Sequence, residues 1–161
     1  MQVAVAQKSI SNKEIEAAKL AIDKGVWTEG EYCAKFSSLL KNYHERKYCQ
    51  LVNSGSSANF IALNACKIKG KWKDGDEVIT CALGFPTTVA PIIQLGLTPI
   101  FIDSKGLNID TDKIVEKISK KTRAIMIAHT LGFPFDIKTV RRICNKHDLI
   151  LIEDVADAIG S

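Results

Sequence analysis

Small residues at Asn53-Ser54-Gly55-Ser56-Ser57 form a segment that is suited to holding a phosphate group. The segment joins an apolar run to a helix-forming run, so free backbone N–H groups and the positive end of the helix dipole would meet there. It is neither a Walker A loop nor a G-x-G-x-x-G loop, because the residues that define those motifs are missing. The alternative is an ordinary turn, since serine is a favoured helix cap.

An acidic residue, Asp154, ends the apolar run of residues 149–152. A carboxylate near a buried strand end needs a partner if it is to stay ionised. One such partner is the protonated nitrogen of a heterocyclic ring. The alternative is that Asp154 caps a turn formed by the residues that follow it.

An aromatic residue, Phe85, lies between Gly84 and Pro86 after another apolar run. A phenyl ring on a turn fixed by proline is able to stack on a flat ligand. The alternative is a core phenylalanine that closes the top of the sheet. Together, a phosphate cradle, a ring platform and an acid for a ring nitrogen are what pyridoxal phosphate requires, because the protonated ring acts as an electron sink.

These segments must be positioned by alternating helices and strands. Near-continuous apolar runs separated by helical patterns predict an α/β domain, with a mostly parallel sheet covered by helices on both faces in three layers. Ligands of such sheets bind beyond the carboxyl ends of the strands, where the three segments fall. Strands are expected at 48–52, 77–81, 99–102, 123–129 and 149–153, and helices at 11–24, 31–43, 58–68, 87–95, 111–119 and 137–147.

Composition narrows the class of protein. The chain has 161 residues, of which 46% are hydrophobic and 25% are charged, as in ordinary globular domains. Its apolar runs are far shorter than the roughly 20 residues of a membrane span, and residues 1–8 do not read as a signal peptide, so we expect a cytoplasmic protein without membrane contact. The net charge of +4 is spread along the chain, which argues against a nucleic-acid partner.

The five cysteines are odd in number and include no C-x-x-C pair. We therefore expect buried free thiols and no metal site. His129 ends a strand near the proposed site and fits either a satisfied structural histidine, which we favour, or a contact to the cofactor or the substrate. Asp103 fits a cap or turn. Trp27 fits either a substrate-facing loop or a core position.

The sequence resembles the DegT/StrS family of pyridoxal-phosphate enzymes that act on nucleotide sugars, which share the type I aspartate-aminotransferase fold. The resemblance rests on NSGSSAN (53–59), GDEVIT (75–80), GFPTTVAPIIQLGLTPIFID (84–103) and IEDVADAIGS (152–161). It implies a cofactor site formed by Gly55, Ser56, Ser57, Phe85, Asp154 and Asp157. The amides of Ser56 and Ser57 would hold the phosphate, Phe85 would stack on the ring, and Asp154 would pair with its nitrogen.

Two features resemble one subgroup, the CDP-4-keto-6-deoxyglucose 3-dehydrases. HTLGFPFD (129–136) is similar to the subgroup's HTLGNPFD, apart from Phe133, and Asp157 stands where most sugar aminotransferases of the family have Gln or His. The resemblance implies pyridoxal or pyridoxamine phosphate, a nucleotide-sugar substrate and a role in deoxysugar or lipopolysaccharide O-antigen biosynthesis. It also implies a homodimer and a reductase partner.

In the family, the Schiff-base Lys, or the His that replaces it, follows the acidic motif at a distance beyond residue 161. We therefore expect no catalytic residue in this chain, and any [2Fe-2S] ligands would also lie beyond it. The expected organisation is residues 1–47 as N-terminal helices and substrate-facing loop, and 48–161 as the core of an incomplete large domain, with the small C-terminal domain absent. The hypotheses are a sugar 3-dehydrase, a sugar aminotransferase, or a non-catalytic module that binds a phosphorylated ligand or a partner chain.

Overall fold

The computed structural model describes residues 10–161, so the segment 1–8 lies outside the described residues. The chain forms two compact units, Met1–Leu51 and Val52–Ser161.

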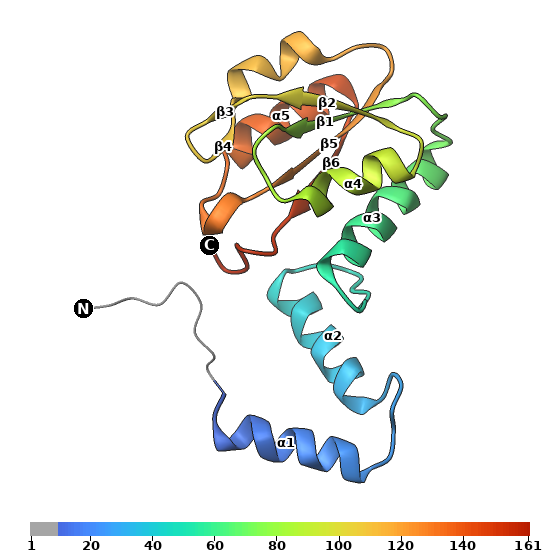
Figure 1. Ribbon diagram of the computed structural model, residues 1–161, viewed down its shortest axis with the longest axis vertical. Helices are drawn as coiled ribbons and strands as arrows, with labels where there is room; N and C mark the ends of the chain where they lie inside the picture. The colour runs from blue at the N-terminus through green and yellow to red at the C-terminus, as the bar shows by residue number, and fades with distance from the viewer. Residues whose placement is uncertain (1–9) are drawn as a thin grey trace, which may run out of the picture. The chain divides into compact units, whose positions relative to one another are not determined.

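The first unit contains two helices, α1 (Asn12–Asp23) and α2 (Glu31–Tyr43) (Figure 1). Ser11 caps α1 in a capping box with Glu14, and Gly25 follows its end with a φ of 66°. Both helices are confirmed as predicted. Trp27 is 77% exposed, which rules out the alternative that it is a core residue.

The strand predicted at residues 48–52 is wrong. This segment has no regular secondary structure, and Tyr48 is 79% exposed. A strand needs a neighbour to satisfy its backbone N–H and C=O groups, and within residues 10–161 no strand pairs with this one. An apolar run therefore does not predict a strand unless a neighbouring strand is available to pair with it.

The second unit is built on a four-stranded parallel sheet. Its strands are β1 (Glu77–Cys81), β2 (Thr98–Ile102), β5 (Thr122–Ala128) and β6 (Ile150–Asp154), in the order β2-β1-β5-β6. The four remaining predicted strands are thus confirmed to within one residue at each end. Parallel pairing brings all four carboxyl ends to one edge of the sheet.

Helices cover both faces of this sheet and complete three layers, as predicted. On one face, Val78 and Met126 pack with Leu63 of α3 (Gly55–Gly70) and Ile92 of α4 (Pro86–Gln94). On the other face, Ile79 and neighbouring strand residues pack against α5 (Ile137–His147). Adjacent residues of a strand thus pack into the cores on opposite faces of the sheet, because side chains alternate along a strand. Figure 1 shows α4 and α5 on either side of the strands.

One predicted helix, 111–119, is wrong. The segment instead forms two short 3₁₀ turns, η1 (Thr111–Lys113) and η2 (Val115–Lys117). The buried side chain of Ile114 and a hydrogen bond from the Ser119 amide to Thr122 Oγ1 hold the segment against the sheet. Its branched residues also have only moderate helix propensity.

Short elements complete the second unit. A two-stranded hairpin, β3 (Ser104–Lys105) and β4 (Asn108–Ile109), follows β2, and a 3₁₀ turn, η3 (Thr130–Gly132), follows β5. Helix α3 begins at Gly55, three residues before the predicted start, so the small-residue segment forms its first turn.

Across residues 10–161 we find no helix long and apolar enough to cross a membrane, and no group of side chains arranged to hold a metal ion. The five cysteines are free, as predicted. Only Cys144 is buried, however; the other four are half-buried, so the prediction of burial is wrong for them. Burial raises the pKa of the Cys144 thiol to about 11.

Candidate functional site

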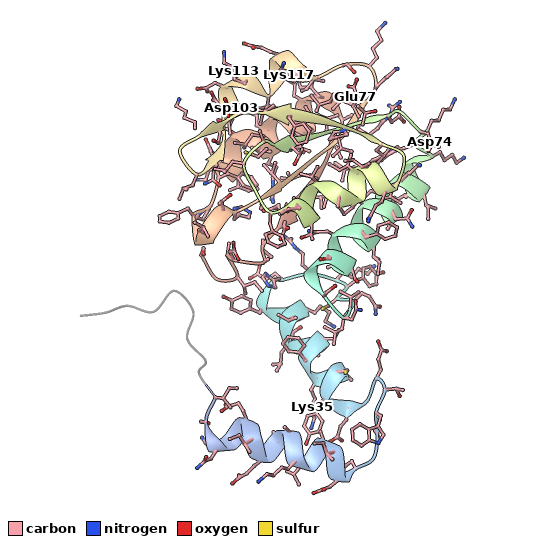
Figure 2. The ribbon with its side chains drawn as sticks, viewed as in Figure 1. Lys35, Asp74, Glu77, Asp103, Lys113 and Lys117 are labelled. Atoms are coloured by element: carbon pink, nitrogen blue, oxygen red, sulfur yellow. The ribbon has the colours of Figure 1, made fainter. Side chains whose placement is uncertain are left out.

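A cavity of about 330 Å³ lies at the carboxyl edge of the sheet. Figure 2 makes this edge easy to find, because Asp103, which follows β2, lies at the opposite end of the sheet from Glu77, which begins β1. Segments that follow β1, β5 and β6 form the cavity together with the first turn of α3. Five of the six predicted site residues line it: Gly55, Ser56, Phe85, Asp154 and Asp157.

Two buried polar side chains hold the Asp154 carboxylate at the end of β6. Its Oδ2 accepts hydrogen bonds from Nδ2 of Asn59 and from Oγ1 of Thr88, both at 2.8 Å. Its Oδ1 accepts from the backbone amide of Ala156 at 3.1 Å, so Asp154 also caps the turn that follows. Because all three donors belong to neutral groups, the carboxylate has no cationic partner among the described residues.

Sequence reasoning missed Asn59 and Thr88. Asn59 is 8% exposed, and its amide also donates to the carbonyl of Thr87, so it links α3, α4 and β6. The available signal was spacing: Asn59 follows Gly55 by one helical turn and therefore lies on the same helix face. Thr88 is 3% exposed and adjoins the Phe85-Pro86 turn.

The first turn of α3 presents unpaired backbone amides. Ser54 is the cap residue, and its Oγ accepts a hydrogen bond from the amide of Ser57. Within residues 10–161 the amides of Gly55 and Ser56 have no hydrogen-bond partner. Ser57 does not line the cavity, so the structure places Gly55 and Ser56, rather than Ser57, where an amide could reach a ligand. A Cβ added at Gly55 would meet open space.

The Phe85 ring lies at the cavity and is 71% exposed, so the alternative of a core phenylalanine is wrong. Phe85 occupies the cap position of α4 and Pro86 the first turn, where its fixed φ favours the helix start. Asp157 is exposed on the turn after β6 and is a second acidic residue in the cavity lining.

His129 is buried, but the prediction of a satisfied histidine holds for only one ring nitrogen: Nε2 has a partner, whereas the buried Nδ1 has none among the described residues. Its ring stacks on Phe135 with centroids 4.1 Å apart, and its Nε2 lies 3.2 Å from Glu153 Oε2. Arg141 Nη2 lies 3.6 Å from the other oxygen of Glu153. The ring of His129 also forms part of the cavity wall. Asp103 likewise has the predicted turn role, because its Oδ1 accepts from the Ser104 amide.

The charge distribution of the cavity suits a ligand with a phosphate at one end and a cationic ring nitrogen at the other. No Lys or Arg side chain is among the described lining residues, so amides at the positive end of α3 are the groups that would meet an anion. The carboxylates of Asp154 and Asp157 supply negative charge elsewhere in the cavity. Asn59 lies four positions after Gly55 in α3, which corresponds to a rise of about 6 Å along the helix.

Fold and cavity together define an α/β protein with a cavity at the carboxyl edge of a parallel sheet. A family model, described as the DegT/DnrJ/EryC1/StrS aminotransferase family, matches residues 8–161. The chain belongs to this family.

Two curated relatives illustrate the similarity. The chain is 43% identical over 160 residues to the lipopolysaccharide biosynthesis protein RfbH of Salmonella typhimurium, covering 96% of this chain and 37% of that protein. It is 42% identical over 138 residues to dTDP-4-dehydro-2,6-dideoxy-D-glucose 3-dehydratase of Saccharopolyspora spinosa, covering 82% of this chain and 30% of that protein. The chain thus spans about a third of the length of these relatives.

Solved structures share the fold. GDP-4-keto-6-deoxymannose-3-dehydratase with a trapped PLP-glutamate geminal diamine superposes with a TM-score of 0.92 at 30% identity, covering 99% of this chain and 42% of that chain. NtdA of Bacillus subtilis with bound PMP gives a TM-score of 0.84 at 32% identity, covering 94% of this chain and 35% of that chain. The type I fold expected from the resemblance is therefore confirmed.

Proposed function

We propose that the protein binds pyridoxal or pyridoxamine phosphate in the cavity and acts on a nucleotide-activated sugar in deoxysugar or lipopolysaccharide biosynthesis. The observation that carries the proposal is the Asp154 carboxylate, which is held by Asn59 and Thr88 in the cavity that the unpaired amides of α3 also line. The names of the relatives, which include a lipopolysaccharide biosynthesis protein and sugar 3-dehydratases, support the same substrate class.

The residues present fit the group. The amides of Gly55 and Ser56 would receive the phosphate, where no side chain fills the space in front of Gly55. The exposed Phe85 ring would stack on the pyridine ring, and Asp154 would hold a proton on the ring nitrogen. Bound there, the protonated ring supplies an electron sink for charge that develops on a substrate.

Of the two reactions that the family suggests, we propose 3-dehydration rather than transamination. The support is that two of the proteins compared above are named 3-dehydratases, and that Asp157 replaces the Gln or His typical of the aminotransferases. Transamination is the second candidate, favoured by the family's own description. The catalytic Lys or His, the homodimer, the reductase partner, the cytoplasmic location and the incomplete large domain all stay predictions.

Cofactor binding is tested by titrating pyridoxamine phosphate into the protein expressed from its complete reading frame. We expect saturable binding that Asp154→Asn weakens about tenfold or more, because the neutral amide no longer favours the protonated ring. Asp148→Asn is the matched control, since Asp148 is exposed and asparagine tolerates its left-handed conformation. Absence of binding by the unmodified protein, or equal binding by Asp154→Asn, would contradict the proposal.

The reaction is tested with a nucleotide-linked 4-keto-6-deoxyhexose. Loss of the C3 hydroxyl in the presence of pyridoxamine phosphate supports dehydration. Formation of an amino sugar in the presence of an amino donor supports transamination instead. Mass spectrometry of the sugar nucleotide separates these products.

A further inference from the structure

The side chain of Asn108 holds the η3 turn, which forms part of the cavity wall. Its Nδ2 donates to the carbonyl of Phe133 at 2.9 Å, and its Oδ1 accepts from the amide of Thr130 at 3.4 Å. Asn108 lies in β4, so these contacts join segments 25 and 22 residues apart. A side-chain amide carries one donor group and one acceptor, and here it satisfies a backbone group at each end of the turn.

The turn has a conformation that needs support. Leu131 has a φ of 53° and a ψ of 32°, which is the left-handed region that a non-glycine residue rarely adopts. The turn is closed by the bond from the Phe133 amide to the Thr130 carbonyl. Leu131 is 67% exposed, so packing of its side chain contributes little. Contacts from outside the turn must therefore stabilise it.

The hairpin that carries Asn108 is itself fixed. The neighbouring residue Ile109 is 5% exposed and belongs to the core that packs on the α5 face of the sheet. The amide of Asp110 donates to the carbonyl of Asp103 at 3.0 Å, which ties the end of the hairpin to the end of β2. Asn108 therefore holds the η3 turn at a fixed position relative to the sheet.

The η3 turn also contacts the site. Thr130 lines the cavity, and a Cβ placed on Gly132 would lie 3.2 Å from the carbonyl oxygen of Asp157. The backbone of η3 therefore packs against the segment that brings Asp157 to the cavity. Movement of the turn would displace both Thr130 and Asp157.

We propose that Asn108 is a positioning residue, which acts through the η3 turn to place Thr130 and Asp157 against a bound ligand. The inference rests on the proposed cofactor cavity. Asn108 does not line that cavity itself, and its effect is expected at the η3 wall rather than at the first turn of α3.

The test compares two probes on the protein expressed from its complete reading frame. Asn108→Ala should weaken the binding of pyridoxamine phosphate about tenfold, because hydrogen-bonding groups in the cavity wall would be misplaced. The affinity for inorganic phosphate should be unchanged. Asn145→Ala, at an exposed position of α5, is the control and should change neither affinity. An equal loss of affinity for both probes, or an unchanged affinity for both, would overturn the inference.

A second variant tests the route through the turn. Leu131→Gly removes the cost of the left-handed conformation, so in the Asn108→Ala background it should restore most of the affinity for pyridoxamine phosphate. Amide exchange gives a readout without ligand: the Thr130 amide should exchange faster in Asn108→Ala than in the unmodified protein. Unchanged exchange overturns the inference, whereas absence of pyridoxamine phosphate binding by the unmodified protein contradicts the proposed function alone.

Discussion

At the scale of single residues, the site depends on how Asp154 differs from its neighbour Glu153. The two carboxylates are adjacent in β6, so the strand directs them to opposite faces of the sheet. Glu153 contacts His129 and Arg141, whereas Asp154 accepts from Asn59 and Thr88. Glu153 is thus engaged with basic groups, whereas the three donors to Asp154 are neutral.

Phe85 gives a prediction at this scale. Because its ring is exposed at the cavity, Phe85→Leu should leave the free energy of unfolding within about 0.5 kcal/mol of the original value, as for most surface substitutions. Loss of the stacking between two aromatic rings should weaken the binding of pyridoxamine phosphate by roughly threefold to tenfold. Urea unfolding and a binding titration measure the two effects. A large loss of stability with unchanged binding would indicate a core role instead.

At the scale of elements, α3, α4 and β6 converge on one carboxylate. Helix α4 contributes Thr88 and α3 contributes Asn59, so the orientation of Asp154 depends on how both helices pack on the same face of the sheet. Each helix also brings a cavity-lining residue near its first turn: Phe85 for α4 and Gly55 for α3.

Thr88→Val tests this convergence. Valine keeps the shape of threonine but removes the hydroxyl that donates to Asp154, a hydrogen bond to a charged group worth about 1.5–3 kcal/mol. We expect a lower free energy of unfolding and weaker binding of pyridoxamine phosphate. Thr98→Val, at an exposed position of β2, is the matched control and should change neither quantity. Indistinguishable results for the two variants would show that the hydroxyl does not hold the carboxylate.

The same elements show what sequence could and could not predict. Helices α2 and α5 were predicted with their observed bounds because amphipathic spacing and local end signals define them. The segments 48–52 and 111–119 were predicted wrongly because their conformations depend on partners elsewhere in the chain. Asn59 and Thr88 were missed for the same reason, since their partner Asp154 lies 95 and 66 residues away.

At the scale of the whole molecule, an ion pair links the starts of the central strands. Asp76, which precedes β1, is 7% exposed and accepts hydrogen bonds from Nε and Nη2 of Arg123 in β5. The Arg123 guanidinium lowers the pKa of Asp76 below its ordinary value of 3.8, against the opposing effect of burial. The carboxylate therefore stabilises the fold above the pKa that it has in the unfolded chain.

The lowered pKa of Asp76 determines how the free energy of unfolding depends on pH. As the pH falls below about 4, the unfolded chain takes up a proton that the folded chain resists, so the contribution of Asp76 is lost through its lowered folded pKa. Asp76→Asn should be less stable at neutral pH and should lose less stability between pH 5 and pH 3, as measured by urea unfolding. Asp112→Asn, in an exposed ion pair with Lys105, is the control. Parallel pH profiles for Asp76→Asn and the unmodified protein would contradict the assignment.

The hydrogen bond between Asn59 and Asp154 has a consequence for synthesis of the chain. It closes the cavity across 95 residues, and the turn with Asp157 follows three residues later. A ribosome-bound chain that has emerged only as far as β5 contains the first turn of α3 but not Asp154. Under the proposed function, a cofactor that depends on Asp154 would be captured only after β6 has left the ribosome.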